Sequence, residues 1–312
     1  MTAILAIHGG AGTIGRETMT AEMEAAHHAG LRRALHAGHV VLAKGGNALD
    51  AVTQAVMALE DDPLFNAGRG AVYTSAGRQE MDAAIMEGQA REAGAVAGIL
   101  GPRHPILAAR AVLESEHVML QGRGAEDFCR DHGVEFAPAA HFHTDRRWDA
   151  LQTELARRAA AAADLRSDAD RHGTVGAVAC DADGNLAAAT STGGMTAKLP
   201  GRIGDCPIFG AGTWADNATC AVSCTGHGES FIRYAAAHEI ASRMRYLGES
   251  LEQASATVVR ELVDIGGNGG LIAVDAKGNF ALPFNSTGMY RGVIGSDGVA
   301  RSAIWGEAML SA

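Results

Sequence analysis

Several features that mark common protein classes are scarce in this sequence of 312 residues. No apolar run approaches the roughly 18 residues of a membrane-spanning helix, so we expect no membrane association. Lys and Arg total 26 against 36 Asp and Glu, and this net charge of −10 argues against nucleic acid as a partner, because nucleic-acid-binding proteins present a basic face. The five cysteines are scattered and odd in number, and Met1–His8 lacks a basic leader segment. Reduced thiols and a cytoplasmic location are therefore expected.

The signatures of well-known catalytic sites are also missing. The sequence has no HExxH zinc motif and no GxSxG nucleophile elbow. His8-Gly-Gly-Ala-Gly12 follows an apolar run and has a partial likeness to the oxyanion loop of esterases, but it fits neither a dinucleotide fingerprint nor a P-loop. Histidines between His27 and His39 have helical spacing, and Cys220 and Cys224 lie in an expected strand. Surface histidines and core thiols are the simpler interpretations, so no transition metal is expected.

Glycine, by contrast, is abundant, with 40 residues against only 7 prolines. Because no collagen-like period is present, these glycines are expected in turns and at close backbone approaches. Apolar runs predict buried strands over 3–8 and 174–180. Composition predicts a helix over 20–44, and a cap at Asn47 with one apolar face predicts a second that ends at Asp61. Further helices are expected over 105–115, 124–131, 146–163, 229–246 and 251–263, the last with a capping box at Ser250–Gln253.

Two segments that lie 94 positions apart resemble each other without a gap. Ala179–Ala187 continues to Met195, and Ala273–Ala281 continues to Met289. Each is predicted to be a hairpin, with an apolar strand, an Asp-x-x-Gly-Asn turn and a returning strand. Two copies indicate a reused sheet element rather than a solenoid.

The junction of residues 173 and 174 is the most informative point of the chain. The polar, charged stretch at about 160–173 predicts a mobile linker, and it runs directly into the buried strand that begins at Thr174. Gly173 can hold a strained amide, and the Thr174 hydroxyl can attack it in an N→O acyl shift. Hydrolysis would leave Thr174 as an N-terminus, whose α-amine, with an ordinary pKa of about 7.7–8.0, can serve as the base for its own hydroxyl. A separate Ser/His/Asp set is then unnecessary.

Several motifs around this junction carry a resemblance to a known family. They are Ile7–Gly12, Pro63–Gly68, Thr174–Val178, Thr190–Met195, Pro200–Asp205 and Ser223–Glu229. Together they resemble the plant-type L-asparaginase/isoaspartyl aminopeptidase family of N-terminal nucleophile hydrolases, from about residue 3 to residue 291. The resemblance implies an αββα four-layer sandwich, a single domain built from two autoproteolytic fragments, 1–173 and 174–312. It also implies a dimer of cleaved αβ protomers.

The same resemblance implies a role for each site residue. Thr174 would be the nucleophile and Thr192 would support its hydroxyl; the hairpin turn midway between them independently predicts that they are neighbours. The other implied roles are the oxyanion hole (Thr225 and Gly226), the substrate α-carboxylate and α-ammonium partners (Arg202 and Asp205), and further contacts to the substrate (Gly228 and Asn66).

The expected substrates are L-asparagine and β-aspartyl dipeptides. Alternatives are a glycosylasparaginase, a Thr-type endopeptidase, or an uncleaved, non-catalytic binding protein of the same fold. No cofactor is expected to be required. Family members carry a monovalent-cation loop of backbone carbonyls, so Na⁺ or K⁺ is implied at Leu59, Glu60, Asp62, Phe65, Ala67 and Arg69.

Overall fold

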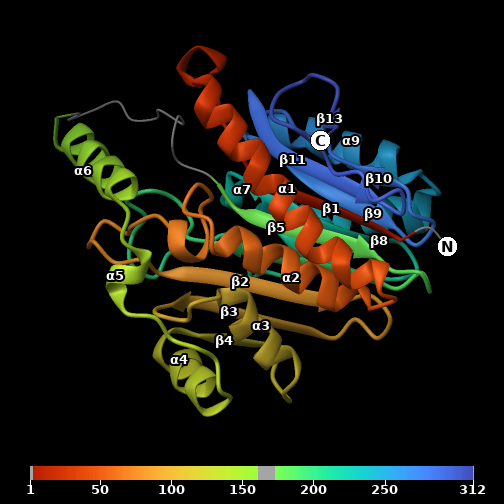
Figure 1. Cartoon of the computed structure of the whole chain (residues 1–312), viewed down its shortest axis with the longest axis horizontal. Coiled ribbons are helices and arrows are strands. Elements are labelled where there is room, and N and C mark those ends of the chain that lie inside the picture. The colour runs from red at the N-terminus through yellow and green to blue at the C-terminus, as the bar shows by residue number, and fades with distance from the viewer. Residues whose placement is uncertain (1–2, 161–172, 312) are drawn as a thin grey trace.

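The computed structural model describes residues 3–160 and 173–311, and it contains two β-sheets that pack face to face (Figure 1). The larger sheet has the spatial order β13 (Leu310–Ser311), β12 (Arg301–Ala303), β11 (Gly288–Gly295), β1 (Ile4–Gly12), β5 (Val175–Cys180), β6 (Leu186–Thr192), β2 (Met81–Glu87), β3 (Ala93–Ile99) and β4 (Met119–Gln121). The smaller sheet has the order β10 (Phe280–Ala281), β9 (Gly269–Asp275), β8 (Cys220–Gly226) and β7 (Thr213–Ala215).

The α-helices of the described residues lie outside the two packed sheets (Figure 1). They are α1 (Ala21–Ala43), α2 (Ala48–Glu60), α3 (Pro105–Leu113), α4 (Gly122–Asp131), α5 (Ala139–Phe142), α6 (Asp145–Ala160), α7 (Gly228–Tyr234), α8 (Ala236–Ser242) and α9 (Leu251–Asp264). One apolar core joins α1, α2 and α3 to the larger sheet, and a second joins α8 and α9 to the smaller sheet. The expected mixed α/β fold with two sheets is confirmed. Within the described residues, no helix is long and apolar enough to cross a bilayer.

Strand β5 is buried on both faces, which explains why its sequence is a continuous apolar run. Val175, Ala177 and Ala179 pack toward the helices, whereas Val178 and Cys180 pack toward the smaller sheet. A strand covered on both faces needs apolar residues at every position. The even-numbered positions of β5 therefore point into the space between the sheets.

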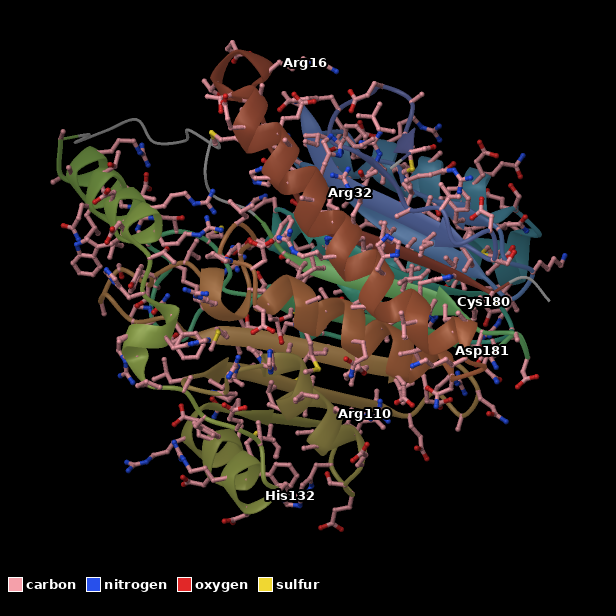
Figure 2. All side chains as sticks on the ribbon, in the orientation of Figure 1. Arg16, Arg32, Arg110, His132, Cys180 and Asp181 are labelled. Carbon is pink, nitrogen blue, oxygen red and sulfur yellow. The ribbon has the colours of Figure 1, made fainter. Side chains whose placement is uncertain are left out.

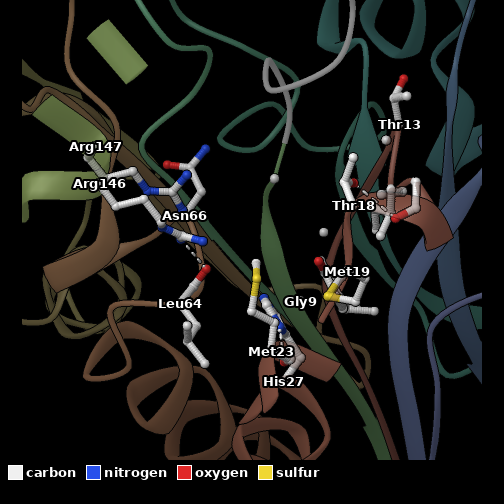
Figure 3. A pocket seen from close by; sticks show the side chains of 17 residues that line it. Gly9, Thr13, Thr18, Met19, Met23, His27, Leu64, Asn66, Arg146 and Arg147 are labelled. Carbon is white, nitrogen blue, oxygen red and sulfur yellow. Dashed lines mark hydrogen bonds between the residues drawn. The ribbon is translucent and has the colours of Figure 1, made fainter. Parts of the chain in front are cut away.

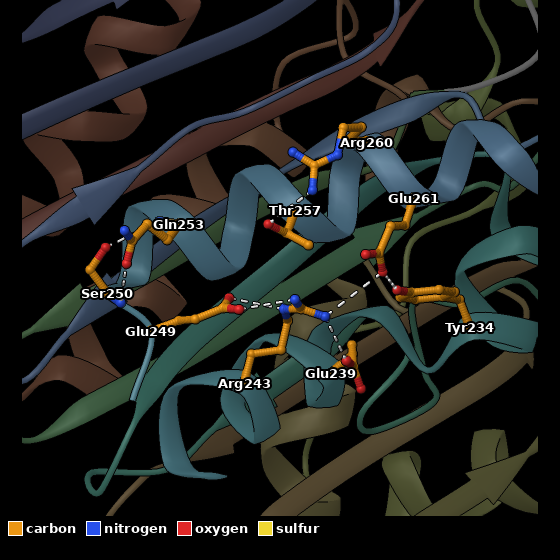
Figure 4. Close-up of polar contacts among 9 residues, drawn as sticks. All are labelled: Tyr234, Glu239, Arg243, Glu249, Ser250, Gln253, Thr257, Arg260 and Glu261. Carbon is orange, nitrogen blue, oxygen red and sulfur yellow. Dashed lines mark hydrogen bonds and ion pairs between the residues drawn. The ribbon is translucent and has the colours of Figure 1, made fainter. Parts of the chain in front are cut away.

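The caps predicted at Asn47 and Ser250 are confirmed, and a third helix has a cap at Thr20 that was not predicted. Thr20 accepts the Met23 N–H at the start of α1, and Asn47 accepts the Asp50 N–H at the start of α2 (2.7 Å). The predicted capping box of α9 is present, with reciprocal bonds between Ser250 and Gln253 (Figure 4). These contacts span only three residues, which is why the sequence reveals them.

The expected helix over 229–246 is wrong as a single element. Ala235 takes a left-handed conformation (φ +53°) that ends α7, and α8 then gives way to a π-helical turn at Arg243–Leu247. Arg243 holds this turn through a forked pair with Glu249 (2.9 Å each) and a contact with Glu239 (3.3 Å) (Figure 4). Because no Gly or Pro stands at the break, the sequence gives no local signal for it.

The two predicted turns use the same hydrogen bonds. Asp181 accepts the N–H groups of Asp183 and Asn185 (3.0 and 2.9 Å), and Asp275 makes the equivalent two bonds in its own turn (2.9 Å each). Asp181, which follows Cys180 at the end of β5 in Figure 2, also accepts the first N–H of α2. The first hairpin thus anchors a helix as well as forming a turn.

The second hairpin differs from the expectation after its turn. Its returning strand, β10, is only two residues long, and the chain then leaves the smaller sheet and enters the larger one as β11. Met289 therefore pairs with Ala11 of β1 rather than continuing the hairpin. The tail beyond Arg291, for which no structure was predicted, adds β12 and β13 to the edge of the larger sheet. The linker expected at 160–173 falls mostly on residues 161–172, outside the described part of the chain.

Close packing of α3 on β3 leads to a first prediction. A Cβ at Gly94 would overlap the Ala109 carbonyl and the Leu113 backbone, whereas a Cβ at Gly124 in α4 would meet open space. We expect Gly94→Ala to lower the free energy of unfolding by about 1–3 kcal/mol, because backbone atoms have to shift. The control Gly124→Ala is expected to raise it by up to about 1 kcal/mol. Urea denaturation measures both; equal midpoints for the two variants would contradict the prediction.

Candidate active site

Polar side chains gather at one end of the space between the two sheets. Thr174 and Thr192 come from the larger sheet, at even-numbered positions of the first hairpin, and Ser223 and Thr225 come from β8 of the smaller sheet. All four are buried. Elsewhere the same space is filled by small and branched apolar residues, so the site begins where the apolar core between the sheets ends.

Three threonines that the sequence predicted as site residues lie in contact. The Thr174 hydroxyl donates to Thr192 Oγ1 (3.1 Å), which also accepts the Gly194 N–H (2.9 Å). Thr225 Oγ1 accepts the N–H groups of Thr174 (3.4 Å) and Ala11 (3.2 Å). Since Thr225 accepts from two donors here, its own O–H is left to donate to a further acceptor. The structure places these groups together, and their catalytic roles stay predictions.

Backbone glycines allow the chain to pass closely around Thr174. Gly226 has φ +141°, and a Cβ there would overlap the Asn268 carbonyl. A Cβ at Gly10 would lie 2.8 Å from the Cα of Gly173, so β1 runs directly beside the junction. Both positions accept only glycine without displacement of the backbone.

Asn66 lies next to the junction but its side-chain amide is already occupied. Its Nδ2 donates to the Gly194 carbonyl (2.7 Å), and its Oδ1 accepts the Val72 N–H (3.0 Å). A Cβ at Gly173 would lie 3.3 Å from the Asn66 Cβ. Asn66 therefore reaches the site as predicted, and it also holds the segment that follows Thr192.

Opposite charges face a small cavity beside Thr174. Arg202 and Asp205 line this cavity together with Thr174 and Thr192. Asp205 is fully buried, and its Oδ2 has no hydrogen-bond partner among the described residues. Burial raises the pKa of Asp205 to about 7, although the nearby Arg202 acts in the other direction. A Cβ at Gly228 would lie 2.7 Å from Asp205 Oδ1 and 3.1 Å from Arg202 Nη2, so the missing side chain keeps the space between the two charges open.

Glu229 belongs to this charge cluster, and the sequence reasoning assigned it no role. Its carboxylate accepts two bonds from the Arg202 guanidinium (3.0 and 2.8 Å). Partial burial acts against ionisation, but the bonds from Arg202 lower the pKa of Glu229. Such a fork fixes the plane of the guanidinium. Glu229 is the last residue of the motif Ser223–Glu229, and its place in that motif was the only indication of a role in the sequence.

His8 was also missed, and it anchors a chain of buried hydrogen bonds beneath Thr174. Its Nδ1 lies 2.9 Å from the Thr174 carbonyl oxygen, and its Nε2 lies 2.9 Å from Ser223 Oγ. Ser223 in turn contacts Thr190 (2.7 Å), which contacts Thr213 (2.7 Å). Because a carbonyl only accepts, Nδ1 carries the proton and Nε2 accepts from Ser223. Before the register shift at His8–Gly10, the even-numbered residues Ile4 and Ala6 of β1 face the smaller sheet, and this period places His8 on the same face.

Comparison with known proteins decides the family. A family model described as asparaginase matches residues 1–304. The chain belongs to the asparaginase family. It is 53% identical to an isoaspartyl peptidase of Salmonella typhimurium, and the match covers 93% of this chain and 94% of the relative. It is 52% identical to an isoaspartyl peptidase of Escherichia coli, and that match covers 93% of this chain and 92% of the relative. A putative isoaspartyl peptidase/L-asparaginase of Dictyostelium discoideum is 44% identical, over 93% of each chain.

The family's expected cation loop, Leu59–Arg69, folds back on itself beside the site. A Cβ at Gly68 would lie 2.6 Å from the Glu60 carbonyl oxygen, so the two ends of this loop lie close together. The Glu60 side chain is buried, which raises its pKa to about 8 despite hydrogen bonds from Ser191 and the Ile106 N–H. Carbonyl oxygens suit Na⁺ or K⁺ as hard cations. Binding of such an ion at this loop stays a prediction.

Other groups considered from the sequence have ordinary structural partners. Cys220 and Cys224 are buried, free thiols in β8, as expected. The expectation of surface histidines is wrong for His27 and His28, which are buried. His27 stacks on Tyr290 with ring centroids 4.3 Å apart, and His28 bonds to a serine hydroxyl. Within the described residues, no group of three or more His, Cys, Asp or Glu side chains is placed to hold a metal ion.

The buried imidazole of His8 leads to a prediction about acid stability. Burial lowers the pKa of His8 to about 3, although the bond to the Thr174 carbonyl opposes this, whereas an unfolded histidine titrates near 6.5. Between these two pH values only the unfolded state takes up the proton, so stability is lost as the pH falls from about 6.5 toward 3.

The variant His8→Gln can make similar hydrogen bonds but has no such titration. We expect the free energy of unfolding of the wild type to fall more steeply than that of His8→Gln over this pH range, as measured by urea denaturation. Parallel pH profiles for the two proteins would show that His8 is not held neutral.

Proposed function

We propose that this protein is an isoaspartyl peptidase/L-asparaginase whose nucleophile is Thr174, activated by cleavage of the Gly173–Thr174 bond. The observation that carries the proposal is the position of the Thr174 hydroxyl. It is bonded to Thr192 and lies in the same small cavity as Arg202 and Asp205. The printed names of the relatives support the same activity.

Maturation is an acyl shift within the chain. Thr174 Oγ attacks the carbonyl carbon of Gly173, the C–N bond of Gly173–Thr174 breaks, and the nitrogen takes the proton to become an amine. Water then hydrolyses the resulting ester and restores the hydroxyl, leaving fragments 1–173 and 174–312. Thr192 is placed to orient the hydroxyl during the attack. His8 binds the carbonyl of Thr174 itself, which holds the residue in place without blocking the reacting one.

Amide hydrolysis uses the new α-amine as the base. The amine takes the Thr174 hydroxyl proton while Oγ attacks the side-chain carbonyl carbon of the substrate. The Thr225 hydroxyl and the Gly226 N–H are proposed to donate to the resulting oxyanion. The C–N bond of the substrate then breaks, the leaving nitrogen receives the proton, and a β-aspartyl ester remains on Thr174. Water cleaves this ester by the same route and releases aspartate.

The charge pair determines which amides are accepted. Arg202 can bind a free α-carboxylate and Asp205 a free α-ammonium on the same carbon of the substrate. The scissile amide must then lie on the substrate side chain. L-asparagine and β-aspartyl dipeptides satisfy this requirement, whereas in an ordinary α-peptide the aspartyl α-carboxylate is itself the amide.

The remaining features of the proposal rest on family membership. The two packed sheets with outer helices support an αββα sandwich of the N-terminal nucleophile hydrolase type. The mature protein is proposed to be a cytoplasmic dimer of cleaved αβ protomers that needs no cofactor beyond a structural Na⁺ or K⁺ at Leu59–Arg69.

Self-cleavage is tested most directly by intact-mass analysis. The wild type should yield two associated fragments, 1–173 and 174–312, and Thr174→Ser should cleave as well because it keeps a hydroxyl. Thr174→Ala should remain one chain and be inactive, since it has no nucleophile. Finding only the full-length chain in an active wild-type preparation would refute the proposed mechanism.

The raised pKa of Asp205 predicts a pH-dependent choice between asparagine and N-acetylasparagine, which has no α-ammonium. Above about pH 7 the ionised carboxylate attracts the ammonium, and losing one such contact costs about 1.5–3 kcal/mol, or roughly ten- to a hundredfold in kcat/KM. The preference for asparagine should therefore be largest at pH 8 and decline below pH 7 as Asp205 is protonated. Titration of the Thr174 amine affects both substrates and cancels in the ratio.

Asp205→Asn is the matched control, because it removes the charge and keeps the shape. The ratio of the two kcat/KM values should be small and independent of pH in this variant. Equal rates of the wild type on both substrates at pH 8 would contradict the role of Asp205, even if Thr174 is the nucleophile.

A further inference from the structure

A second, larger cavity of about 190 Å³ borders Gly173 (Figure 3). Gly173 lines both this cavity and the small one that contains Arg202 and Asp205. Arg202 and Asp205 are proposed to hold the aspartyl part of the substrate, so the leaving group on its side-chain amide points away from these two residues. A dipeptide whose aspartyl part lies beside Arg202 and Asp205 must therefore place its second residue elsewhere, and the larger cavity is adjacent.

The charges around the larger cavity favour an anion. Arg146 and Arg147, in the first turn of α6, lie on one side of it together with Asn66 (Figure 3). Among the described residues that line this cavity, none is acidic. His27 also lines it, but burial lowers the pKa of this imidazole, which is therefore neutral near pH 7. The two arginines thus supply the charge at this surface.

The remaining wall suits an apolar side chain. Ile14, Met19 and Met23 line the cavity, together with the stacked rings of His27 in α1 and Tyr290 in β11. A positive group on one side and an apolar wall on the other match the two ends of a free amino acid with an aliphatic side chain, its carboxylate and its hydrocarbon part.

The two arginines are held differently. Arg147 Nε donates to the Gly70 carbonyl (2.7 Å), so the Arg147 side chain is already engaged with the protein. Arg146 is anchored through Nη2 alone, which donates to the carbonyls of Leu64 (2.7 Å) and Pro63 (3.3 Å). The anchoring orients the Arg146 guanidinium and leaves its other nitrogens to bind an anion in a bidentate manner.

We propose that the larger cavity is the leaving-group subsite for β-aspartyl dipeptides, and that Arg146 binds the α-carboxylate of the amino acid that is released. The inference rests on the proposed function, since it concerns the second half of the same substrate. It also explains how one active site can serve two kinds of leaving group. Ammonia from asparagine needs no contact in this cavity, whereas an amino acid uses it.

Three substrates separate this proposal from a general effect on catalysis. They are β-aspartyl-leucine, its C-terminal amide, which lacks the negative charge, and L-asparagine. Arg146→Gln should lower kcat/KM for β-aspartyl-leucine by about tenfold, the expected effect of losing one partly exposed charge-assisted contact. Its values for the amide and for asparagine should stay within twofold of the wild type. Arg123→Gln, at an exposed position of α4 outside both cavities, is the matched control and should leave all three unchanged.

The other outcomes overturn the proposal in distinguishable ways. An equal loss on all three substrates would show that Arg146 acts on the fold or on Thr174, and no loss on β-aspartyl-leucine would show that its carboxylate is not bound there. A selective loss in Arg147→Gln instead of Arg146→Gln would exclude the assignment to Arg146. A wild type that hydrolyses none of the three substrates would refute the proposed function itself, whereas all the preceding outcomes leave that function standing.

Discussion

The close approach of β5 to β8 at Gly176 is the constraint on which the site depends. A Cβ at this position would overlap Ser223 Oγ and lie 2.5 Å from His8 Nε2, so the two sheets meet here with no space for a methyl group. This contact lets a hydroxyl from one sheet bond to an imidazole from the other, and that imidazole holds the carbonyl of Thr174. The position of the reactive hydroxyl is thereby determined by packing between layers rather than by a flexible loop.

Interactions between nearby residues were predictable from the sequence. The caps at Asn47 and Ser250 close over three residues, and the turn at Asp181 closes over four. The contact of Thr174 with Thr192 follows from the same hairpin, in which a short turn fixes the pairing of the two strands. For the other threonine, Thr225, only the resemblance to a family predicted proximity, because it lies in a different sheet.

Features set by distant parts of the chain could not be predicted. Ala235 adopts a left-handed conformation, which an alanine does not predict. The sequence after Ala281 likewise does not indicate that the chain passes from the smaller sheet to the larger one. His8 and Glu229 stood within recognised motifs, but their importance comes from partners 166 and 27 positions away. The alternation along β1 shows which face His8 occupies, but its role is not apparent until its partners are known.

The order of strands in the larger sheet has a consequence for the protein after the proposed cut. The N-terminal fragment contributes β1, which is hydrogen-bonded on one side to β11 and on the other to β5, both from the C-terminal fragment. Further along the sheet, β6 of the C-terminal fragment pairs with β2 of the N-terminal fragment, so the two fragments alternate a second time. The fragments are thus interleaved, and neither can leave without opening backbone ladders. Once denatured, however, they would have to find each other by diffusion, so recovery of the native state would depend on concentration, whereas the intact precursor folds as one molecule.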